Sequence, residues 1–332
     1  MTLERALDLL APTKSLLLAV SGGPDSVALM LLCANWPERA AHDIAIATVD
    51  HGLRSDSRAE AETVCGWARA LGFEHHLLTW TGEKPATRIQ ERAREARYGL
   101  LTDCARAIGA GAVVTAHHAD DQAETILFRL TRGSGVTGLS GMAPVARLGA
   151  LTLLRPLLDL RKSALVGVCH AGGHPFFSDP SNADQAYARA RIRKLLPALD
   201  ELGLDTDALL RLGARAARAD AALDACARDL RARAVREAGP QLASFDADPL
   251  REAPIELFQR VVAAEIARLA PDAQIRLDRL ERAVARLAEA LQSRKALRLT
   301  LCGLIMELTG NVMKLEPAPR RRTPPPEACG GS

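Results

Sequence analysis

The stretch from Leu16 to Ser26 constrains the fold of this chain more than any other. It begins with consecutive apolar residues, as a strand buried on both faces does, and the apolar run stops at a Ser-Gly-Gly-Pro sequence over residues 21–24. A helical pattern follows from Val27. A strand, a glycine-rich turn and a helix in this order direct backbone N–H groups, and the positive end of the helix dipole, toward one anion. The sequence therefore predicts a phosphate-binding loop.

The side chains of this loop suit a nucleotide phosphate and a metal ion. Hydroxyl groups of Ser21 and Ser26 can reach phosphate oxygens, and Asp25 can hold a divalent cation against them. A tight turn with an N-capping serine would fit the same residues. The loop matches neither the Walker A pattern, which needs a lysine, nor Gly-x-Gly-x-x-Gly. It resembles the PP-loop of the ATP pyrophosphatase superfamily, which implies ATP binding and pyrophosphate release at Ser21, Gly22, Gly23, Pro24, Asp25 and Ser26.

Composition sets broad limits on the function. A chain of 332 residues with 48% hydrophobic and 25% charged residues is typical of a globular protein of two domains. A net charge of +3 is too small to indicate nucleic-acid binding by itself. None of the seven cysteines forms a Cys-x-x-Cys pair, so we expect no iron–sulfur or zinc site. Without a signal segment or an apolar run of ~18 residues, we expect a cytoplasmic protein that does not enter a membrane.

Apolar runs alternate with helical patterns over residues 1–197. This alternation predicts an α/β domain with a parallel sheet and right-handed crossovers, in which functional groups gather at the carboxyl ends of the strands. Residues 21–26, 50–54 and 117–124 each follow such a strand directly. We also expect a short N-terminal helix over residues 1–13. The predicted strands cover 16–20, 44–49, 75–78, 112–115 and 151–154, and the main helices after the first cover 56–71, 87–108, 117–125 onward and 162–171.

The pattern changes near residue 198. Apolar residues from Leu209 to Leu230 are spaced alternately by three and four, which predicts a long helix, and a second helical stretch covers 254–291. Residues 297–315 alternate as strands do, with turn signals between them. We therefore predict a mainly helical second domain over 198–316 with a C-terminal hairpin. The Pro- and Arg-rich tail, 317–332, is expected to be disordered.

Four further segments carry unusual polar residues. Asp121 and Glu124 share one side of a predicted helix that opens with two histidines, His117 and His118, although carboxylates there also suit an ordinary capping turn. Arg94 and Arg97 lie one helical turn apart. Gly133, Ser134 and Gly135 begin a second glycine-rich loop that reaches Gly141. The run Arg189, Arg191, Arg193 and Lys194 follows Asp179-Pro180-Ser181-Asn182, and it fits an RNA contact or a solvated linker.

Together these segments resemble the tRNA(Ile)-lysidine synthetases. The resemblance covers residues 15–195 and implies an adenine nucleotide alpha-hydrolase-like fold for the first domain. It implies a ligase that uses ATP to adenylate the wobble cytidine of the isoleucine tRNA with a CAU anticodon, after which free L-lysine displaces AMP. The matching residues are Ser21–Ser26, His51–Arg54, Arg94, Arg97 and Tyr98, His117–Thr125, Gly133–Gly141, Arg155–Leu158 and Asp179–Arg193.

The resemblance also implies roles for individual residues. Asp25 would coordinate Mg²⁺, His51 would belong to the ATP site, and Arg97 would stabilise charge at the reacting phosphate. Asp121 and Glu124 would hold the lysine ammonium group and take its proton, with His117 as the alternative base. Arg189, Arg191, Arg193 and Lys194 would contact tRNA phosphates. The sequence leaves the oligomeric state open, with a homodimer as one option.

Two other functions compete with this interpretation. A tRNA 2-thiocytidine sulfurtransferase shares the ATP loop, but it resembles a cysteine-dependent class with Cys-x-x-Cys pairs, and this chain has none. A non-catalytic nucleotide sensor of similar fold would need neither the second glycine-rich loop nor the domain after residue 198. Pyrophosphate exchange that depends on tRNA would distinguish an enzyme from such a sensor.

Overall fold

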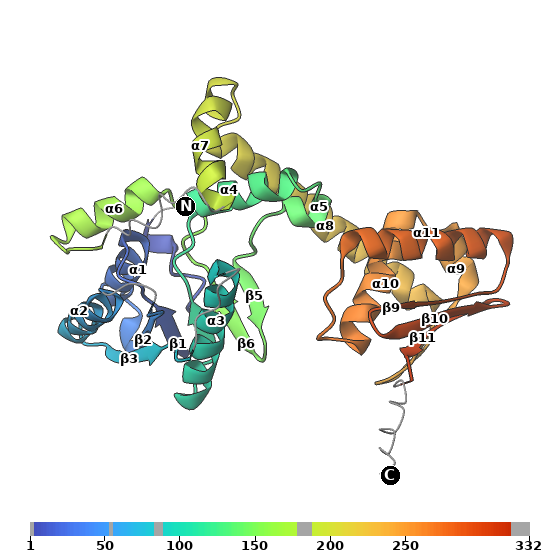
Figure 1. Cartoon of the computed structure of the whole chain (residues 1–332), viewed down its shortest axis with the longest axis horizontal. Helices are drawn as coiled ribbons and strands as arrows, with labels where there is room; N and C mark the ends of the chain where they lie inside the picture. Colours follow the sequence, from blue (N-terminus) through green and yellow to red (C-terminus); the bar gives the residue numbers. More distant parts are fainter. Residues whose placement is uncertain (1–2, 53–55, 83–88, 178–187, 320–332) are drawn as a thin grey trace, which may run out of the picture. The chain divides into compact units, whose positions relative to one another are not determined.

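The computed structural model describes residues 3–52, 56–82, 89–177 and 188–319. The chain divides into two compact units, residues 1–217 and 218–332 (Figure 1). The sequence predicts the change of domain after residue 197. The first unit extends further because α7 (Ala188–Glu201) and the start of α8 (Thr206–Ala234) pack on α4 (Ala119–Leu130) through Ile192 and Leu209.

A six-stranded sheet with the order β3-β2-β1-β4-β6-β5 forms the centre of the first unit. Its first five strands in that order are parallel, as predicted, whereas β5 pairs antiparallel with β6 at the edge of the sheet. The sequence analysis missed β5. The strands are β1 (Ser15–Ala19), β2 (Asp43–Asp50), β3 (Glu74–Thr79), β4 (Ala112–Val114), β5 (Val145–Leu148) and β6 (Leu151–Leu154).

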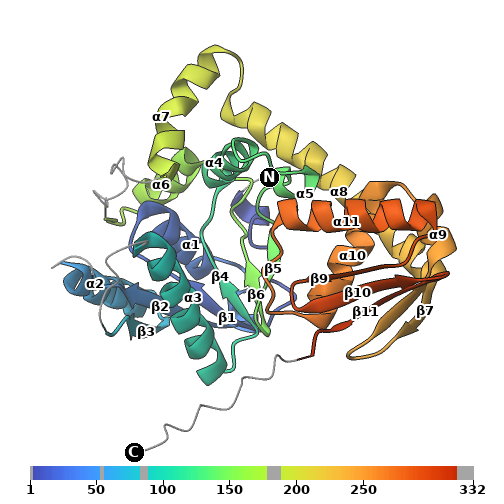
Figure 2. The same cartoon turned by 45° about the vertical axis from the view of Figure 1, so that its right-hand side comes forward.

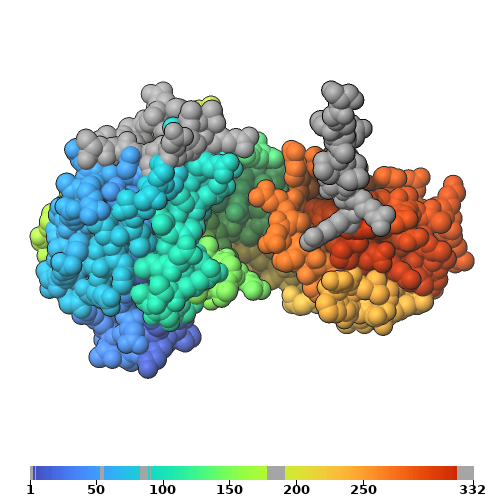
Figure 3. Space-filling view, turned by 60° about the horizontal axis from the view of Figure 1, so that its bottom comes forward, coloured from blue at the N-terminus to red at the C-terminus, as the bar shows by residue number. Residues whose placement is uncertain are grey.

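Helices cover both faces of this sheet (Figure 1). Side chains of a strand alternate between its two faces, so Leu16 and Leu18 of β1 pack with α1 (Pro24–Ala34), α2 (Ser57–Ala70) and α6 (Lys162–Ala171). Leu17 and Ala19 face the other way, toward α3 (Ile89–Ala107). Both faces of β1 are buried, which explains its unbroken apolar run. The outer side of α3 lies at the surface (Figure 3).

The N-terminal segment differs from the helix expected over residues 1–13. It forms a short 3-10 helix, η1 (Leu3–Arg5), followed by turns, and a second 3-10 helix, η2 (Arg39–Ala41), lies before β2. Ala6, Leu7 and Leu10 of these turns are buried in the first core. So short a segment gains little from helix formation alone, and burial of its apolar side chains decides its path.

The second unit is built around a five-stranded antiparallel sheet with the order β7-β8-β11-β10-β9 (Figure 2). Helices still hold more of its described residues than strands do, and the predicted hairpin is one part of this sheet. Three helices, α9 (Ala247–Glu252), α10 (Ile255–Leu269) and α11 (Leu277–Ser293), pack on it with the end of α8. The strands are β7 (Val235–Ala238), β8 (Ala243–Asp246), β9 (Leu297–Leu301), β10 (Leu304–Thr309) and β11 (Val312–Pro317).

The C-terminal tail and the possibility of a membrane-spanning helix were both addressed by the sequence. Most of the tail expected to be disordered, residues 320–332, lies outside the described residues. Among the helices that the structure describes, none combines the length and the apolar character that crossing a membrane requires.

Candidate active site

The predicted phosphate loop lies between the end of β1 and the start of α1. Gly22 has a φ of 87°, a value that glycine adopts without strain. The hydroxyl of Ser26 donates to the carbonyl oxygen of Gly23 (2.9 Å) and accepts from the backbone N–H of Ser21 (3.1 Å). Ser26 is buried and holds the loop from inside, whereas Ser21 is exposed. Ser26 therefore helps to hold the loop in shape.

Asp25 lies in the first turn of α1. Its Oδ1 atom is buried and has no hydrogen-bond partner within the described residues. Its Oδ2 atom lies 3.4 Å from Nε2 of His118 and 3.9 Å from Nζ of Lys162. A buried carboxylate oxygen without a partner is costly unless a cation completes it, so this residue fits the predicted metal ligand. Lys162, at the start of α6, brings to the loop a positive charge that the loop sequence itself lacks.

His118 is the residue around which the acidic side chains converge. It is buried and precedes α4, and the Asp121 carboxylate accepts the backbone N–H of His118 at 3.2 Å. Burial lowers the pKa of His118, but the carboxylates of Asp120, Asp25 and Asp121 together outweigh burial and raise it to about 9. His118 is therefore protonated at neutral pH. The hydrogen bond between His118 and Asp120 is in turn the main cause that lowers the pKa of Asp120 to about 2.

Sequence reasoning named His117 and missed His118 as a site residue. His117 is half-buried, and its Nδ1 lies 2.9 Å from the Thr115 hydroxyl. A His-x-x-Asp pattern at the start of a helix was the available signal, because it identifies residue 118 as the helix N-cap. Asp121 does lie in this cluster, with Oδ2 3.4 Å from Nε2 of His118.

Glu124 lies one turn further along α4 and is paired with Arg193 of α7. The Arg193 Nε donates to Glu124 Oε1 at 2.5 Å, and Glu124 is buried. The other carboxylate oxygen, Oε2, is buried without a partner among the described residues. Arg193 was expected to contact tRNA phosphate, but here its charge is directed at Glu124. Arg191 and Lys194 are exposed, and the Arg189 side chain is outside the described residues.

Two further arginines come from α3 and from the residue that follows β6. Arg97 is half-buried and makes no hydrogen bond or ion pair within the part of the chain that is described. Burial lowers the pKa of Arg97, although the nearby Tyr98 acts to raise it. Arg155 is buried, donates from Nη1 to the Ala143 carbonyl oxygen (2.7 Å), and leaves Nε without a partner in the described residues. Each of these guanidinium groups could bind an anion that arrives with a substrate.

The second glycine-rich loop is fixed to α4 by two side chains that the sequence did not reveal. Arg129 donates to the carbonyl oxygens of Gly138 (2.9 Å) and Gly141 (2.6 Å). Gln122 bonds the backbone of Met142 in both directions, at 2.7 and 2.9 Å. Gly133, Ser134 and Gly135 precede a single turn of helix, α5 (Val136–Leu139). The loop is therefore held at its far end by the helix that carries the acidic cluster.

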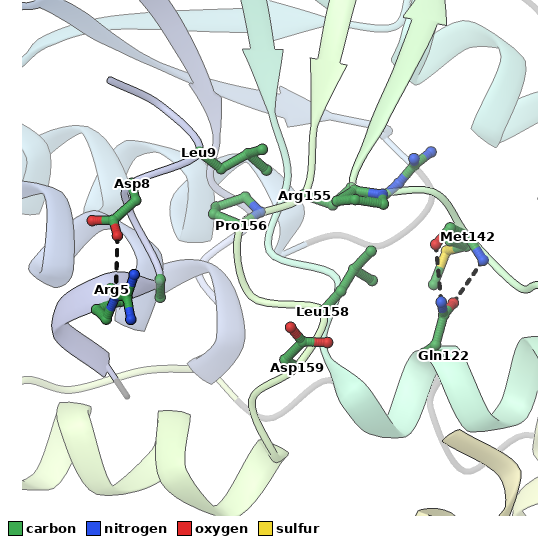
Figure 4. A pocket seen from close by; sticks show the side chains of 11 residues that line it. Arg5, Asp8, Leu9, Gln122, Met142, Arg155, Pro156, Leu158 and Asp159 are labelled. Atoms are coloured by element: carbon green, nitrogen blue, oxygen red, sulfur yellow. Dashed lines mark hydrogen bonds and ion pairs between the residues drawn. The ribbon is translucent and has the colours of Figure 1, made fainter. Parts of the chain in front are cut away.

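A cavity of about 800 Å³ lies beside this attachment, between the N-terminal turns, α4 and the segment after β6 (Figure 4). Arg5 and Asp8 on its rim pair with each other at 3.5 Å. Part of its described lining comes from the matching segments 117–125 and 155–158, but it includes none of the residues to which the sequence assigned an individual role. The lining residues are Arg5, Ala6, Asp8, Leu9, Gln122, Met142, Pro144, Arg155, Pro156, Leu158 and Asp159.

The turn after β2 contains the remaining predicted ATP residue, His51. Its ring meets Trp80 edge-on, with the ring centroids 6.3 Å apart. The preceding Asp50 accepts hydrogen bonds from Gly52 N (2.9 Å) and from the Ser57 hydroxyl (2.6 Å), which together fix the start of α2. Arg54 and the Asp179–Asn182 motif lie outside the described residues.

Comparisons with known proteins concern the family and the fold of the chain. A family model described as a PP-loop domain matches residues 2–199. The U34-tRNA thiolase NcsA from Methanococcus maripaludis, solved with its [4Fe-4S] cluster, is similar with a TM-score of 0.55 at 12% identity, covering 64% of this chain and 77% of the thiolase. This likeness concerns the fold alone.

Curated relatives extend the similarity beyond the PP-loop domain. The tRNA(Ile)-lysidine synthase of Methylobacterium sp. (strain 4-46) is 50% identical over 309 residues, which cover 92% of this chain and 89% of the relative. The synthase of Bradyrhizobium diazoefficiens is 42% identical over 342 residues, which cover 96% and 95%. Because these alignments include the second unit, they concern nearly the whole protein. The chain therefore belongs to the tRNA(Ile)-lysidine synthase family.

Proposed function

We propose that this protein is a ligase that forms a carbon–nitrogen bond between free L-lysine and the wobble cytidine of the isoleucine tRNA with a CAU anticodon. In the first step, cytidine O2 attacks the α-phosphorus of ATP and pyrophosphate leaves. In the second step, the lysine ε-amine attacks C2 of the cytidine and AMP leaves. The observation that carries the proposal is the acidic cluster beside the phosphate loop, where ATP and an amine nucleophile can meet.

The phosphate loop supplies the groups needed for the first step. The exposed Ser21 hydroxyl and the backbone N–H groups before α1 bind phosphate oxygens, and Lys162 adds a positive charge close to them. Asp25 would hold Mg²⁺ through its unpartnered Oδ1 atom, and a bound ion would supply positive charge for the departing pyrophosphate. Arg97 stabilises the charge that develops at the reacting phosphate.

The second step needs a neutral amine. At pH 7 about one lysine side chain in a few thousand is neutral, so the free-energy cost of deprotonating the ammonium group is about 4.6 kcal/mol. Asp121 and the unpartnered Oε2 of Glu124 accept protons of the ammonium group and hold it in place. Because the pKa of His118 is raised to about 9, His118 is a poor base and serves to hold the carboxylates together. His117 remains the alternative base, since an ordinary histidine has a pKa nearer 7.

The exposed cations of α7 are assigned to the tRNA. Arg191 and Lys194 contact phosphates of the anticodon stem, and the second unit adds discrimination between tRNAs. A 2-thiocytidine sulfurtransferase is the weaker candidate, because no two cysteines of the sequence are spaced as Cys-x-x-Cys.

The direct test incubates the full-length protein with ATP, Mg²⁺, labelled lysine and unmodified isoleucine tRNA. We expect label in that tRNA, one AMP and one pyrophosphate per lysine incorporated, and no label in methionine tRNA with the same anticodon. Thiolated tRNA that forms without lysine, when a sulfur donor is supplied, would refute the proposal in favour of thiolation. Pyrophosphate release without any tRNA product would refute the lysine step.

A further inference from the structure

An apolar floor lies directly under the phosphate loop. A Cβ atom placed on Gly22 would be 2.7 Å from Cδ2 of Phe177 and 3.0 Å from Cγ2 of Val64. The Phe177 ring and the α2 side chain of Val64 therefore contact the loop backbone with no space for a larger residue. None of the sequence patterns pointed to Phe177, which lies 155 positions after Gly22 in the chain.

Phe177 also bonds the loop through its main chain. Its backbone N–H donates to the carbonyl oxygen of Gly22 at 2.9 Å. In a planar trans peptide the C=O and the following N–H point in opposite directions, and the described residues contain no cis peptide. A Gly22 carbonyl held toward Phe177 therefore directs the N–H of Gly23 away from it. Within the described residues the Gly23 N–H has no acceptor, so it remains available to an anion at the start of α1.

The Phe177 ring is itself held by neighbours. The ring of Trp67, from α2, stacks on the Phe177 ring, with the centroids 5.1 Å apart and an angle of 25° between the ring planes. Trp67 also meets the ring of His174 edge-on, with the centroids 5.0 Å apart. Val64 is fully buried in the same region. The floor thus combines side chains from α2 with the segment that follows α6, and it fixes one peptide of the loop from two directions.

We propose that Phe177 is a positioning residue for ATP: it fixes the Gly22–Gly23 peptide so that the Gly23 N–H is directed at a phosphate oxygen. This role rests on the proposed use of the loop for ATP phosphates. A donor that is already oriented loses no freedom when ATP binds, and hydrogen bonds to charged oxygens are stronger than those between neutral groups. A residue that only fills the core would affect stability without changing ATP affinity.

The test compares Phe177→Ala with Phe176→Ala in the full-length protein. Phe176 is half-buried beside Phe177, but it meets His170 edge-on at 5.8 Å and is not among the atoms nearest to Gly22. We expect Phe177→Ala to raise the Kd for Mg·ATP, measured by calorimetry, and the KM for ATP in pyrophosphate release about tenfold. The kcat should change about twofold or less. Phe176→Ala should lower Tm with an unchanged Kd, and Phe177→Tyr, which keeps the ring, should restore the Kd.

A double-mutant cycle provides an independent measurement. Gly22→Ala places a methyl group against the Phe177 ring, and removal of the ring provides space for it, so the two effects on the Kd should be less than additive. If Phe177→Ala does not fold, Phe177→Leu replaces it in the same comparison. An unchanged Kd in Phe177→Ala, or in Phe177→Leu where that variant replaces it, would overturn the proposal, as would strict additivity with Gly22→Ala. The calorimetric Kd needs only Mg·ATP, so normal ATP binding without tRNA modification would count against the proposed function alone.

Discussion

Replacing Arg193 by methionine tests the ion pair that α7 makes with the acidic cluster. The pair joins residues 69 positions apart, and only 5% of the Glu124 side chain is exposed, against 38% of Arg193. Removing one partner of a fully buried pair costs about 3–5 kcal/mol, because the other charge is left uncompensated. Since more than a third of Arg193 is exposed, water can solvate part of this charge, and we expect a loss of about 1–3 kcal/mol in the free energy of unfolding.

Urea denaturation measures this loss, with Arg191→Met as the matched control. Arg191 lies on the same helix but is exposed, so its replacement should change the free energy of unfolding by less than about 0.5 kcal/mol. Combining Arg193→Met with Glu124→Gln removes both charges and should recover part of the stability. Equal urea midpoints for Arg193→Met and Arg191→Met would show that the pair contributes nothing. An additive double variant would likewise contradict the direct contact.

Four further predictions concern the rest of the site. Asp25→Asn should lower pyrophosphate release at least about 100-fold with an unchanged Tm, and near-normal release would exclude a metal-holding role. Replacing Arg191 and Lys194 by alanine should lower the slope of log K against log salt by about two units for cognate and non-cognate tRNA alike. With EDTA present in both samples, the free energy of unfolding of His118→Gln should be about 3 kcal/mol below that of the wild type at pH values under 6.5. That difference should disappear as the pH rises through about 9, because the folded-state pKa is raised; a constant difference would contradict this. A chain ending at residue 217 should be more stable to heat than one ending at 196, which lacks the contacts of Leu209 with α4.

The sheet of the first unit could be predicted because its information is local. Each parallel strand is a short apolar run that ends at glycine or polar residues, and burial on both faces removes any ambiguity of alternation. The antiparallel strand β5 escaped notice because its four residues are alternately exposed and half-buried. Its two-residue connection to β6, which contains Gly149 with a φ of 60°, was a hairpin signal in the sequence.

Two strands of the second unit, β7 and β8, were missed for a related reason. Strand β7 has three exposed residues out of four, so no apolar pattern marks it, and β8 is short and fully apolar only at Ala243 and Phe245. Both strands are defined by pairing, with β8 joining β7 to β11. Pairing of β8 with a strand more than 60 residues later cannot be inferred from spacing within either segment.

The arginines of α7 show where sequence patterns stop and tertiary contacts begin. Ile192 and Leu196 mark the apolar side of this helix, and successive residues turn by about 100°. Arg191 and Arg193 then flank the apolar side, whereas Lys194 lies away from it. The helical pattern could thus have reduced four candidate phosphate contacts to a smaller solvent-facing set. It could not have chosen Arg193 over Arg191 as the partner of Glu124, because that choice depends on which flank of α7 meets α4, and only the packed structure contains this information.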